Sequence, residues 1–281
     1  MVSQMVNNET TYQEYSVLMS VYYKETPENL KTAMESIWSQ TVLPAEFILM
    51  CDGQLGEGLD DVIKNMEKMH PALHVVRLSK NGGLGNALNV GLRYCTHELV
   101  ARMDSDDISR PDRCEKQIKI FKEKPEISVI SGTVEEFSES VDVIDARREL
   151  PETSEEIIRF SRKRNPFNHP CVMYKKSAVE AAGGYQDFYL LEDYYLWIRM
   201  LQNGAKGYNC PEPLLWMRAG SGLYKRRSGW KYAKSQRKLF LYMRKQGYIG
   251  WGRYLLSVTE RTIVSIIPGR MREALFKKMV R

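Results

Sequence analysis

Three carboxylates, Asp104, Asp106 and Asp107, stand within four residues directly after the apolar run 99–103. Carboxylates this close repel one another, and burying one without a partner is costly or shifts its pKa. Hard divalent cations such as Mg²⁺ and Mn²⁺ take oxygen ligands, commonly one or two carboxylates together with substrate phosphates. The cluster therefore predicts a metal–diphosphate site. The alternative is a polar turn in which Asp104 or Asp107 caps the next helix.

Short apolar runs alternate with helical stretches from residue 15 to about residue 210. We expect strands at 15–21, 46–51, 74–78, 99–103, 127–132 and 168–174. Helices are expected at 27–40, with Thr26 and Pro27 as cap and first residue, at 59–69, from the glycine-rich turn 81–85 to about 95, and at 178–184 and 190–201. This alternation predicts an α/β fold with a mainly parallel central sheet flanked by helices.

Polar residues follow four of these strands. Tyr22, Asp52, Asn81 and the acidic run 104–107 each come just after an apolar run. In open α/β sheets, ligands bind at the carboxyl ends of the strands. The series of polar strand ends therefore favours the metal–diphosphate interpretation over an isolated polar turn.

Composition limits the other classes of protein. The five cysteines show no Cys-x-x-Cys spacing, which argues against a zinc site or a disulfide framework and fits a reducing cytoplasm. The first ten residues are polar, and no apolar run reaches the length of about eighteen residues that a spanning helix needs. We therefore expect neither a signal peptide nor a transmembrane helix.

The net charge of +6 is unevenly distributed along the chain. Only two of the 35 acidic residues, Glu260 and Glu273, follow residue 217, whereas 17 of the 41 lysines and arginines do. Such asymmetry indicates a basic segment that faces polyanions. It predicts a polar tail over 1–14, an α/β domain over 15–217 and a basic, helical C-terminal extension over 218–281.

The ordered motifs resemble those of inverting family-2 glycosyltransferases, which have the GT-A fold, over about residues 15–215. The resemblance rests on the strand 15–23, Asp52-Gly53, the turn and helix 81–91, the Asp104/Asp106 pair, and Glu192-Asp193 with Trp197. Segments 168–170 and 191–197 are typical of bacterial enzymes of capsule, O-antigen and exopolysaccharide assembly. The resemblance implies a metal-dependent transfer of sugar from a nucleotide-sugar, with UDP-sugars favoured.

The same resemblance assigns the nucleotide contacts. Asp52 matches the residue that hydrogen-bonds the nucleobase, and Tyr22 would lie against the base. Asn81 and Gly85 belong to the turn where the backbone approaches the nucleotide closely, because glycine has no side chain to obstruct it. The alternatives are a simple Asp-Gly turn for Asp52 and a core aromatic residue for Tyr22.

The acidic run matches the metal and ribose positions of the family. Asp106 would coordinate Mn²⁺ or Mg²⁺ directly, and Asp104 would hold the ribose or a metal-bound water. Ser105 lies between them as a donor-binding residue, and Asp107 would support the metal or cap the following helix. The ion would stabilise the leaving nucleoside diphosphate as a Lewis acid.

Asp193 matches the catalytic base, which would remove the proton of the acceptor hydroxyl. Adjacent residues on a helix point about 100° apart, so Glu192 cannot share the role of Asp193 as base. Glu192 would instead contact the donor or acceptor sugar. An acidic first helical turn is the alternative for this pair. His169 and Trp197 are further candidates for acceptor or sugar contacts, and a structural histidine is the alternative for His169.

The basic extension has two expected roles. Arg218 and Arg226, from the loop 218–227, would pair with the donor diphosphate. Apolar residues at helical spacing over 251–266, and an amphipathic basic stretch over 271–281, indicate binding to an anionic membrane surface. Packing of these helices against the catalytic domain is the alternative. We expect no nucleic-acid partner, because no recognised binding motif accompanies the charge.

Together these features predict an inverting hexosyltransferase that acts on a glycan acceptor, with a polyprenyl-diphosphate-linked glycan favoured, at the cytoplasmic face of the cell membrane. Two rival functions are a sugar-1-phosphate nucleotidyltransferase and a catalytically silent module that binds nucleotide-sugars. The first rival lacks its usual glycine loop here, since the segment 20–25 contains no glycine. Intact Asp104, Asp106 and Asp193 argue against the second.

Overall fold

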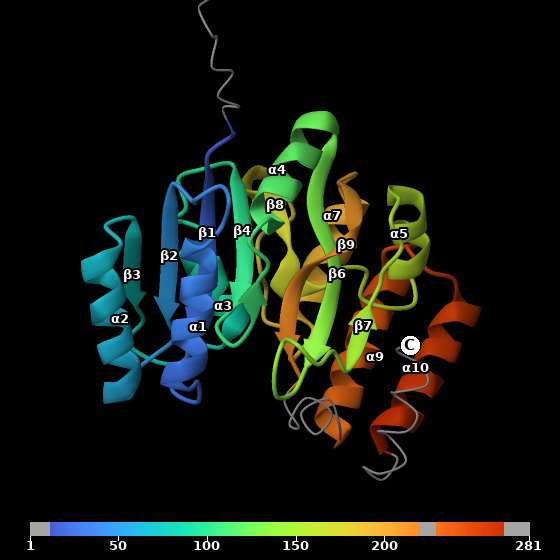
Figure 1. Ribbon diagram of the computed structural model, residues 1–281. Helices are drawn as coiled ribbons and strands as arrows, with labels where there is room; N and C mark the ends of the chain where they lie inside the picture. Colours follow the sequence, from blue (N-terminus) through green and yellow to red (C-terminus); the bar gives the residue numbers. More distant parts are fainter. Residues whose placement is uncertain (1–11, 220–228, 267–281) are drawn as a thin grey trace, which may run out of the picture.

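The computed structural model describes residues 12–219 and 229–266. Within these residues the strands form one sheet in the order β3-β2-β1-β4-β8-β6-β9-β5, with β7 paired to β6 (Figure 1). The parallel half consists of β1 (Tyr15–Val21), β2 (Glu46–Cys51), β3 (Leu73–Arg77) and β4 (Leu99–Asp104). The other half consists of β5 (Ile108–Ser109), β6 (Ile127–Phe137), β7 (Ala146–Arg148), β8 (Met173–Lys175) and β9 (Lys206–Arg218).

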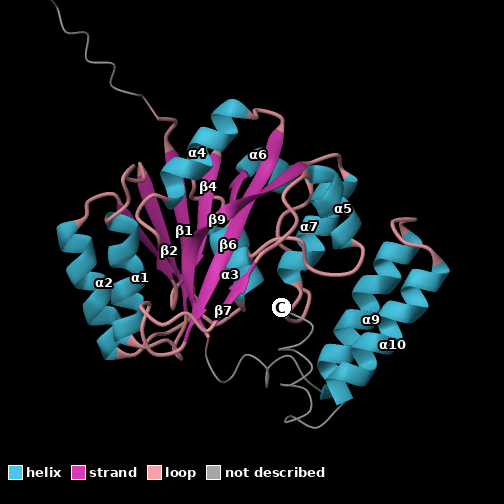
Figure 2. Ribbon diagram, turned by 45° about the vertical axis from the view of Figure 1, so that its right-hand side comes forward, coloured by secondary structure: helices cyan, strands magenta, loops and turns pink. Residues whose placement is uncertain are grey.

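Helices cover both faces of this sheet, and a helical pair stands at one end (Figure 2). The helices are α1 (Pro27–Trp38), α2 (Glu57–Met69), α3 (Leu84–Gly91), α4 (Arg113–Glu123), α5 (Ser154–Ser161), α6 (Lys176–Ala181), α7 (Glu192–Gln202), α9 (Gly229–Lys245) and α10 (Trp251–Ile266). The expected α/β architecture is confirmed. So is the start of α1, where Thr26 accepts a hydrogen bond from the Asn29 N–H and Pro27 is the first helical residue.

Two apolar cores lie on opposite faces of the sheet. Along β1, Val17 and Met19 belong to one core and Leu18 to the other, because successive side chains point to opposite faces. The first core also contains residues of α1, α2 and α4, and the second contains residues of α3, α6 and α7. Burial on both faces explains why these strands read as continuous apolar runs.

Several elements differ from the expectation, and α4 and α5 were not predicted. The segment 168–174 is a 3₁₀ turn, His169–Cys171, followed by β8, because Pro170 has no N–H for a strand ladder and the Cys171 N–H instead donates to the Asn168 carbonyl. The long strand β9 escaped detection because Pro211 and Pro213 interrupt it, and its register against β6 shifts there. The helix α3 ends at Gly91, short of the expected residue 95.

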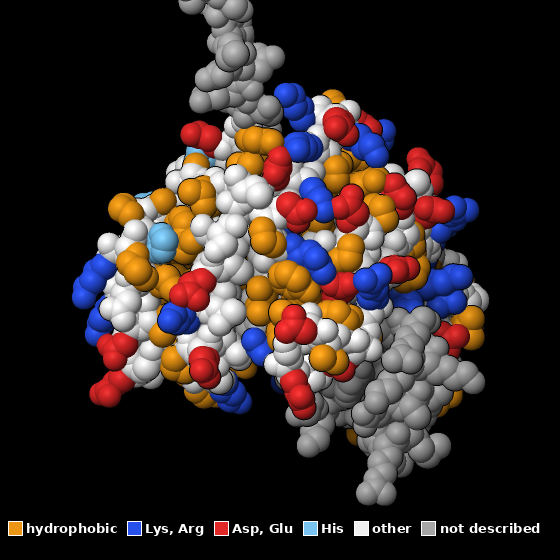
Figure 3. Space-filling model, in the orientation of Figure 1, with side chains coloured by type: hydrophobic (Ala, Val, Ile, Leu, Met, Phe, Trp, Pro, Cys, Tyr) orange, Lys and Arg blue, Asp and Glu red, His pale blue; other side chains and the backbone are white. Residues whose placement is uncertain are grey.

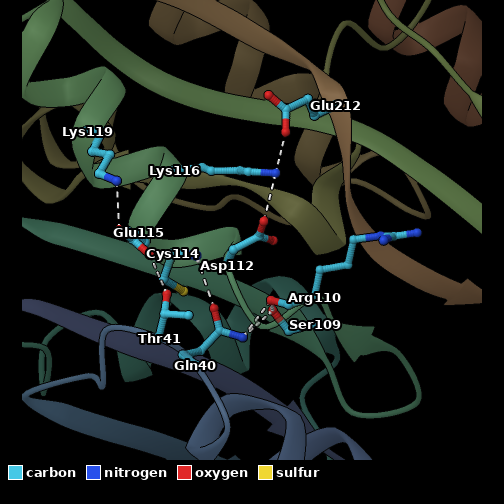
Figure 4. A network of polar contacts seen from close by, with 10 residues as sticks. All are labelled: Gln40, Thr41, Ser109, Arg110, Asp112, Cys114, Glu115, Lys116, Lys119 and Glu212. Atoms are coloured by element: carbon cyan, nitrogen blue, oxygen red, sulfur yellow. Dashed lines mark hydrogen bonds and ion pairs between the residues drawn. The ribbon is translucent and has the colours of Figure 1, made fainter.

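A buried glutamine fixes the segment that follows the acidic run (Figure 4). The Gln40 amide nitrogen donates to the Ser109 hydroxyl at 3.1 Å and to the Arg110 carbonyl at 2.8 Å. Its amide oxygen accepts from the Cys114 N–H at 3.0 Å. Gln40 follows α1, so one side chain ties the end of α1 to β5 and to the start of α4. This contact limits where the acidic run between β4 and β5 can lie.

The helices α9 and α10 form a hairpin that packs against α7. Its interface is a third core, in which Ile198 of α7 meets Leu239 and Phe240 of α9 and Tyr254 of α10. The hairpin thus packs on the catalytic domain in part, while Trp251 and Leu255 of the expected apolar face stay exposed, and membrane binding stays a prediction. Arg226 and the amphipathic stretch 271–281 lie outside the described residues. The division of the chain at residue 217 stays a prediction, and none of the described helices is long and apolar enough to cross a membrane.

Candidate active site

The carboxyl ends of the parallel strands bring the predicted residues to one edge of the sheet. Ser20 of β1 stands beside Asp104 of β4, and Val21 stands beside Cys51 of β2. Asp52 and the acidic run therefore flank the end of β1, which Tyr22 follows. Beyond β4 the sheet changes from parallel to antiparallel pairing, since β8 runs opposite to β4. This is the kind of switch point where α/β folds bind ligands.

Asp52 holds the glycine-rich turn in place. Its two carboxylate oxygens accept hydrogen bonds from the Gly82 N–H at 2.7 Å and from the Gly83 N–H at 2.9 Å. The Asn81 amide nitrogen donates to the Asp52 carbonyl at 3.1 Å. Gly53 has a φ of 88°, and a side chain there would meet the Asn81 backbone. Asp52 and Asn81 thus lie together as predicted, and their contacts to a nucleotide stay predictions.

The glycine-rich turn 81–85 packs against α7, the helix that carries the predicted base Asp193. A Cβ placed on Gly85 would stand 3.3 Å from the Glu192 Cβ. A larger residue at position 85 would therefore push against the first turn of α7. Gly85 serves this close approach between two parts of the site, and its contact with a donor stays a prediction.

The carboxylates of Asp104, Asp106 and Asp107 converge, with one oxygen of each within 4.8 Å of the others. Burial, followed by the charges of Asp104 and Glu25, raises the pKa of Asp106 to about 7. Burial and the charges of Asp106 and Asp104 also raise the pKa of Asp107 well above its usual value. Oxygen-rich, mutually repelling ligands of this kind fit a hard divalent cation. Sequence reasoning missed Glu25, whose carboxylate accepts from the Ser105 hydroxyl at 3.2 Å.

A buried arginine lies beneath this cluster. Arg102 of β4 is fully buried and forms an ion pair with Asp104, while its Nε and Nη1 have no hydrogen-bond partner. Burial by itself would lower the pKa of Arg102, but the Asp104 carboxylate outweighs it and the pKa is raised. Sequence reasoning missed Arg102, although a charge inside an apolar strand was a signal. Arg102 is the internal counter-ion of the acidic cluster.

The end of β9 joins the acidic cluster through Arg218. Its backbone N–H donates to the Asp107 carboxylate at 2.8 Å, and its Nε donates to the Asp106 carbonyl at 3.1 Å. The pairing of β5 with β9 brings these residues together across more than a hundred positions. Asp107 does not cap the following helix, which begins only at Arg113. Pairing of Arg218 with a diphosphate stays a prediction.

Glu192 and Asp193 begin α7 and face different surroundings. The two carboxylate oxygens of Asp193 accept from the Asn165 amide and from the Tyr194 N–H, each at 2.6 Å. For Glu192, burial and the neighbouring charge of Asp193 raise the pKa to about 7. Asn165 was not predicted, because only the tertiary fold brings it to Asp193. The structure thus offers one carboxylate with a fixed orientation and a second one beside the glycine-rich turn.

Two residues predicted to contact a sugar are buried. Trp197 is fully buried in the second core, against Phe167 and Tyr174, so the prediction that it contacts a sugar is wrong. His169 is also buried, with its Nε2 3.0 Å from the Tyr185 hydroxyl. Burial, aided by the charge of Arg102, lowers the pKa of His169 well below its usual value. Burial and the contact with Tyr185 favour the structural interpretation of His169.

Residues 16–183 match the family model described as glycosyl transferase family 2. The chain belongs to this family. It is 40% identical over 267 residues, covering 94% of this chain and 98% of the relative, to the amylovoran biosynthesis glycosyltransferase AmsE of Erwinia amylovora. It is 37% identical over 268 residues, covering 95% of this chain and 97% of the relative, to the UDP-Gal:alpha-D-GlcNAc-diphosphoundecaprenol beta-1,3-galactosyltransferase of Escherichia coli. The family-2 protein is therefore a glycosyltransferase, as the motifs predicted.

Solved glycosyltransferase structures confirm the GT-A fold. The mannosyltransferase PcManGT of Pyrobaculum calidifontis, in complex with GDP-Man and Mn²⁺, superimposes with a TM-score of 0.65 at 16% identity, covering 96% of this chain and 76% of that one. TarS 1–349 of S. aureus, in complex with UDP-GlcNAc, gives 0.62 at 16% identity, covering 82% and 66%. At this identity the likeness shows the fold alone.

Proposed function

We propose that this family-2 glycosyltransferase transfers a sugar from a UDP-sugar, with inversion, to a diphosphate-lipid-linked glycan in the synthesis of a bacterial surface polysaccharide. The observation that carries the proposal is the convergence of three aspartates at the strand edge, close enough to the N-terminus of α7 that, besides burial, the charge of Asp104 helps to raise the pKa of Glu192. The names of the two relatives, one an amylovoran enzyme and one a galactosyltransferase acting on a diphosphoundecaprenol acceptor, support the class of donor and acceptor.

The acidic cluster is the proposed place of the divalent cation, Mn²⁺ or Mg²⁺. Asp106 would be a direct ligand, Asp107 a supporting one, and Asp104 would act through the ribose or a water. The cation supplies Lewis-acid stabilisation of the leaving diphosphate. Binding of the cation would also stabilise the charged form of Asp106, and so offset the burial and the neighbouring negative charges that raise its pKa. Arg102 and Arg218 add positive charge at the same place.

Asp193 is the proposed general base. Its carboxylate would take the proton of the acceptor hydroxyl as that oxygen attacks the anomeric carbon on the face opposite the diphosphate. The hydrogen bonds from the Asn165 amide and the Tyr194 N–H fix the plane of this carboxylate, which makes Asn165 a positioning residue. Glu192, close to the glycine-rich turn, would contact the donor sugar.

The hairpin of α9 and α10 supports a place on the cytoplasmic membrane surface. The hairpin exposes the large apolar side chains Trp230, Trp251, Leu255 and Ile263, each more than half exposed. The helix α9 carries no acidic residue and six lysines or arginines. Apolar side chains beside basic ones are typical of helices that lie on anionic lipid. We propose that this surface brings the enzyme to its lipid-linked acceptor.

Protection from thermal unfolding tests the donor. The full chain is heated with UDP-sugars, GDP-mannose or nucleoside triphosphates, each with and without Mn²⁺. Binding to the folded state raises Tm, so we expect a rise for UDP-sugars that depends on Mn²⁺ and is lost in Asp106→Asn. A rise only with nucleoside triphosphates would instead support a nucleotidyltransferase. Protection without release of UDP in the presence of acceptor would support the silent binding module.

A further inference from the structure

A second cavity lies away from the donor site, between α5 and the loop that joins α9 to α10. Its volume is about 780 Å³. Four cationic side chains line it, three from the end of α5 and the residues after it and one from α10: Arg159, Arg162, Lys163 and Arg253. Figure 3 shows lysine and arginine side chains gathered at the edge of the molecule where α5 and the hairpin lie. The function described above does not use this cavity.

The positive charge of the cavity is poorly balanced from within the protein. Among the described residues, Arg159, Arg162 and Lys163 form no ion pair within 4.0 Å. The one acidic lining residue, Glu156, accepts the hydrogen bond of the Thr153 hydroxyl in the capping box of α5. Four cations gathered around one lining carboxylate leave an excess of positive charge that attracts a further anion, and arginine is suited to bidentate binding of phosphate oxygens.

A buried donor in the wall supports an anionic ligand. The Nε of Arg253 is buried and has no hydrogen-bond partner, while its Nη2 stands 3.6 Å from Glu260. A buried N–H without an acceptor is costly, and a small rotation of the Arg253 side chain toward the cavity would let a ligand oxygen accept from it. The wall itself is held together by polar contacts, since the Ser161 and Tyr248 hydroxyls are 2.6 Å apart and Arg261 donates to the Lys163 carbonyl at 2.9 Å.

The same stretch of chain leads from the cavity to the proposed base. Lys163 lines the cavity, and Asn165, two residues later, donates to the Asp193 carboxylate. Two residues of chain span at most about 7 Å between their Cα atoms. The Tyr194 hydroxyl also donates to the Ser161 carbonyl at 2.5 Å, which joins α7 to the end of α5. A ligand in the cavity would therefore lie against the same segment of chain that orients the Asp193 carboxylate.

We propose that this cavity binds the diphosphate of the acceptor. The inference rests on the proposed function and deepens it by giving the acceptor's charged group a site. Where the acceptor is a single sugar on the lipid diphosphate, the reacting hydroxyl and the diphosphate belong to the same pyranose ring, so the two groups need neighbouring sites on the enzyme. The apolar residues Trp251 and Leu255, next along the chain from the cavity loop, are exposed and offer a surface to the lipid chain.

Binding of a water-soluble acceptor analogue tests the inference without requiring turnover. The analogue is N-acetylglucosaminyl diphosphate on a short alkyl chain, and the comparison ligand is the same sugar and chain without the diphosphate. The wild-type chain should prefer the diphosphate ligand. Arg162→Gln/Lys163→Gln should weaken its binding about 100-fold, since each of the two lost charged contacts is worth about one decade, and should leave the neutral ligand unaffected.

A matched variant controls for the loss of two positive charges. Lys64→Gln/Lys68→Gln removes two exposed lysines from α2, at the opposite edge of the sheet (Figure 1), and should bind both ligands as the wild type does. The inference is overturned if the cavity variant binds the diphosphate ligand within about twofold of the control. It is also overturned if the variant loses binding only to phosphatidylglycerol vesicles, because the cavity would then hold lipid headgroups.

The assay separates this inference from the proposed function. If the wild-type chain binds the diphosphate ligand through the cavity but transfers no sugar from any UDP-sugar, the proposed donor is wrong and the cavity assignment stands. If it transfers sugar to the diphosphate ligand and the cavity variant has an unchanged KM for it, the cavity assignment is wrong and the proposed function stands.

Discussion

Replacing Asp193 by asparagine tests the assignment of the base. A general base contributes about 10²- to 10⁴-fold to the rate, which is about 3–5 kcal/mol of barrier at 1.36 kcal/mol per decade. The substitution has a structural cost too. The Asn165 amide and the Tyr194 N–H each donate to one oxygen of Asp193, whereas asparagine offers one oxygen and one NH₂. One donor therefore loses its acceptor, at a net cost of about 1 kcal/mol of unfolding free energy.

A swapped variant separates these two effects. In Asp193→Asn/Asn165→Asp, the carboxylate introduced at position 165 accepts from the amide introduced at position 193, and the oxygen of that amide accepts from the Tyr194 N–H. We expect the double variant to regain the free energy of unfolding that Asp193→Asn loses, but to keep its low kcat. Urea unfolding and transfer of radiolabelled sugar measure the two quantities. Activity of Asp193→Asn above a few per cent of wild type, or recovery of kcat in the swapped variant, would refute the role of Asp193 as base.

Three further predictions concern the support of the site. Arg102→Met should lower the unfolding free energy by about 3 kcal/mol, as measured by urea unfolding. This is the low end of the range for a broken buried ion pair, because the Asp104 side chain is 34% exposed. A loss below about 1 kcal/mol would contradict the prediction. Gln40→Leu should lower the unfolding free energy by about 1–3 kcal/mol in the same assay, because the buried Cys114 N–H loses its acceptor, and an unchanged value would count against it. The pKa of Asp106, about 7 in the folded protein, lies above its unfolded value, so the metal-free fold binds more protons and its Tm should fall as pH rises from about 4 to 7. Mn²⁺ should reverse this fall near pH 7, and Asp106→Asn should make the fall smaller, with Asp107 and Glu192 accounting for what remains.

The sequence predicted the parts of the fold that depend on local pattern. The strands β1, β2 and β4 are buried on both faces, so their apolar runs were unambiguous, and the polar residues after them marked the ligand edge. The donor side of the site followed from this edge and from the resemblance, since Asp52, Asn81 and the acidic run all come directly after strands.

Features that depend on contacts between distant segments could not be predicted in this way. Asn165 and Asp193 are 28 residues apart, and no local pattern pairs them. Trp197 was misassigned because the sequence places it on a helix beside the base but does not say which face of that helix is buried. The strand β9 contains two prolines and shows no simple alternation of apolar and polar residues. The contact that it makes between Arg218 and Asp107 could therefore not be predicted.

Because the hairpin packs on α7, it cannot be removed from the catalytic domain without exposing apolar surface. The helix that begins with Glu192 and Asp193 buries Ile198 against Leu239 and Phe240 of α9. A shortened protein ending at Arg218 would expose that face of α7 to water, although every donor-site carboxylate would still be present. The hairpin is therefore not a detachable anchor, and exchanging it between relatives would require exchanging the matching face of α7 as well.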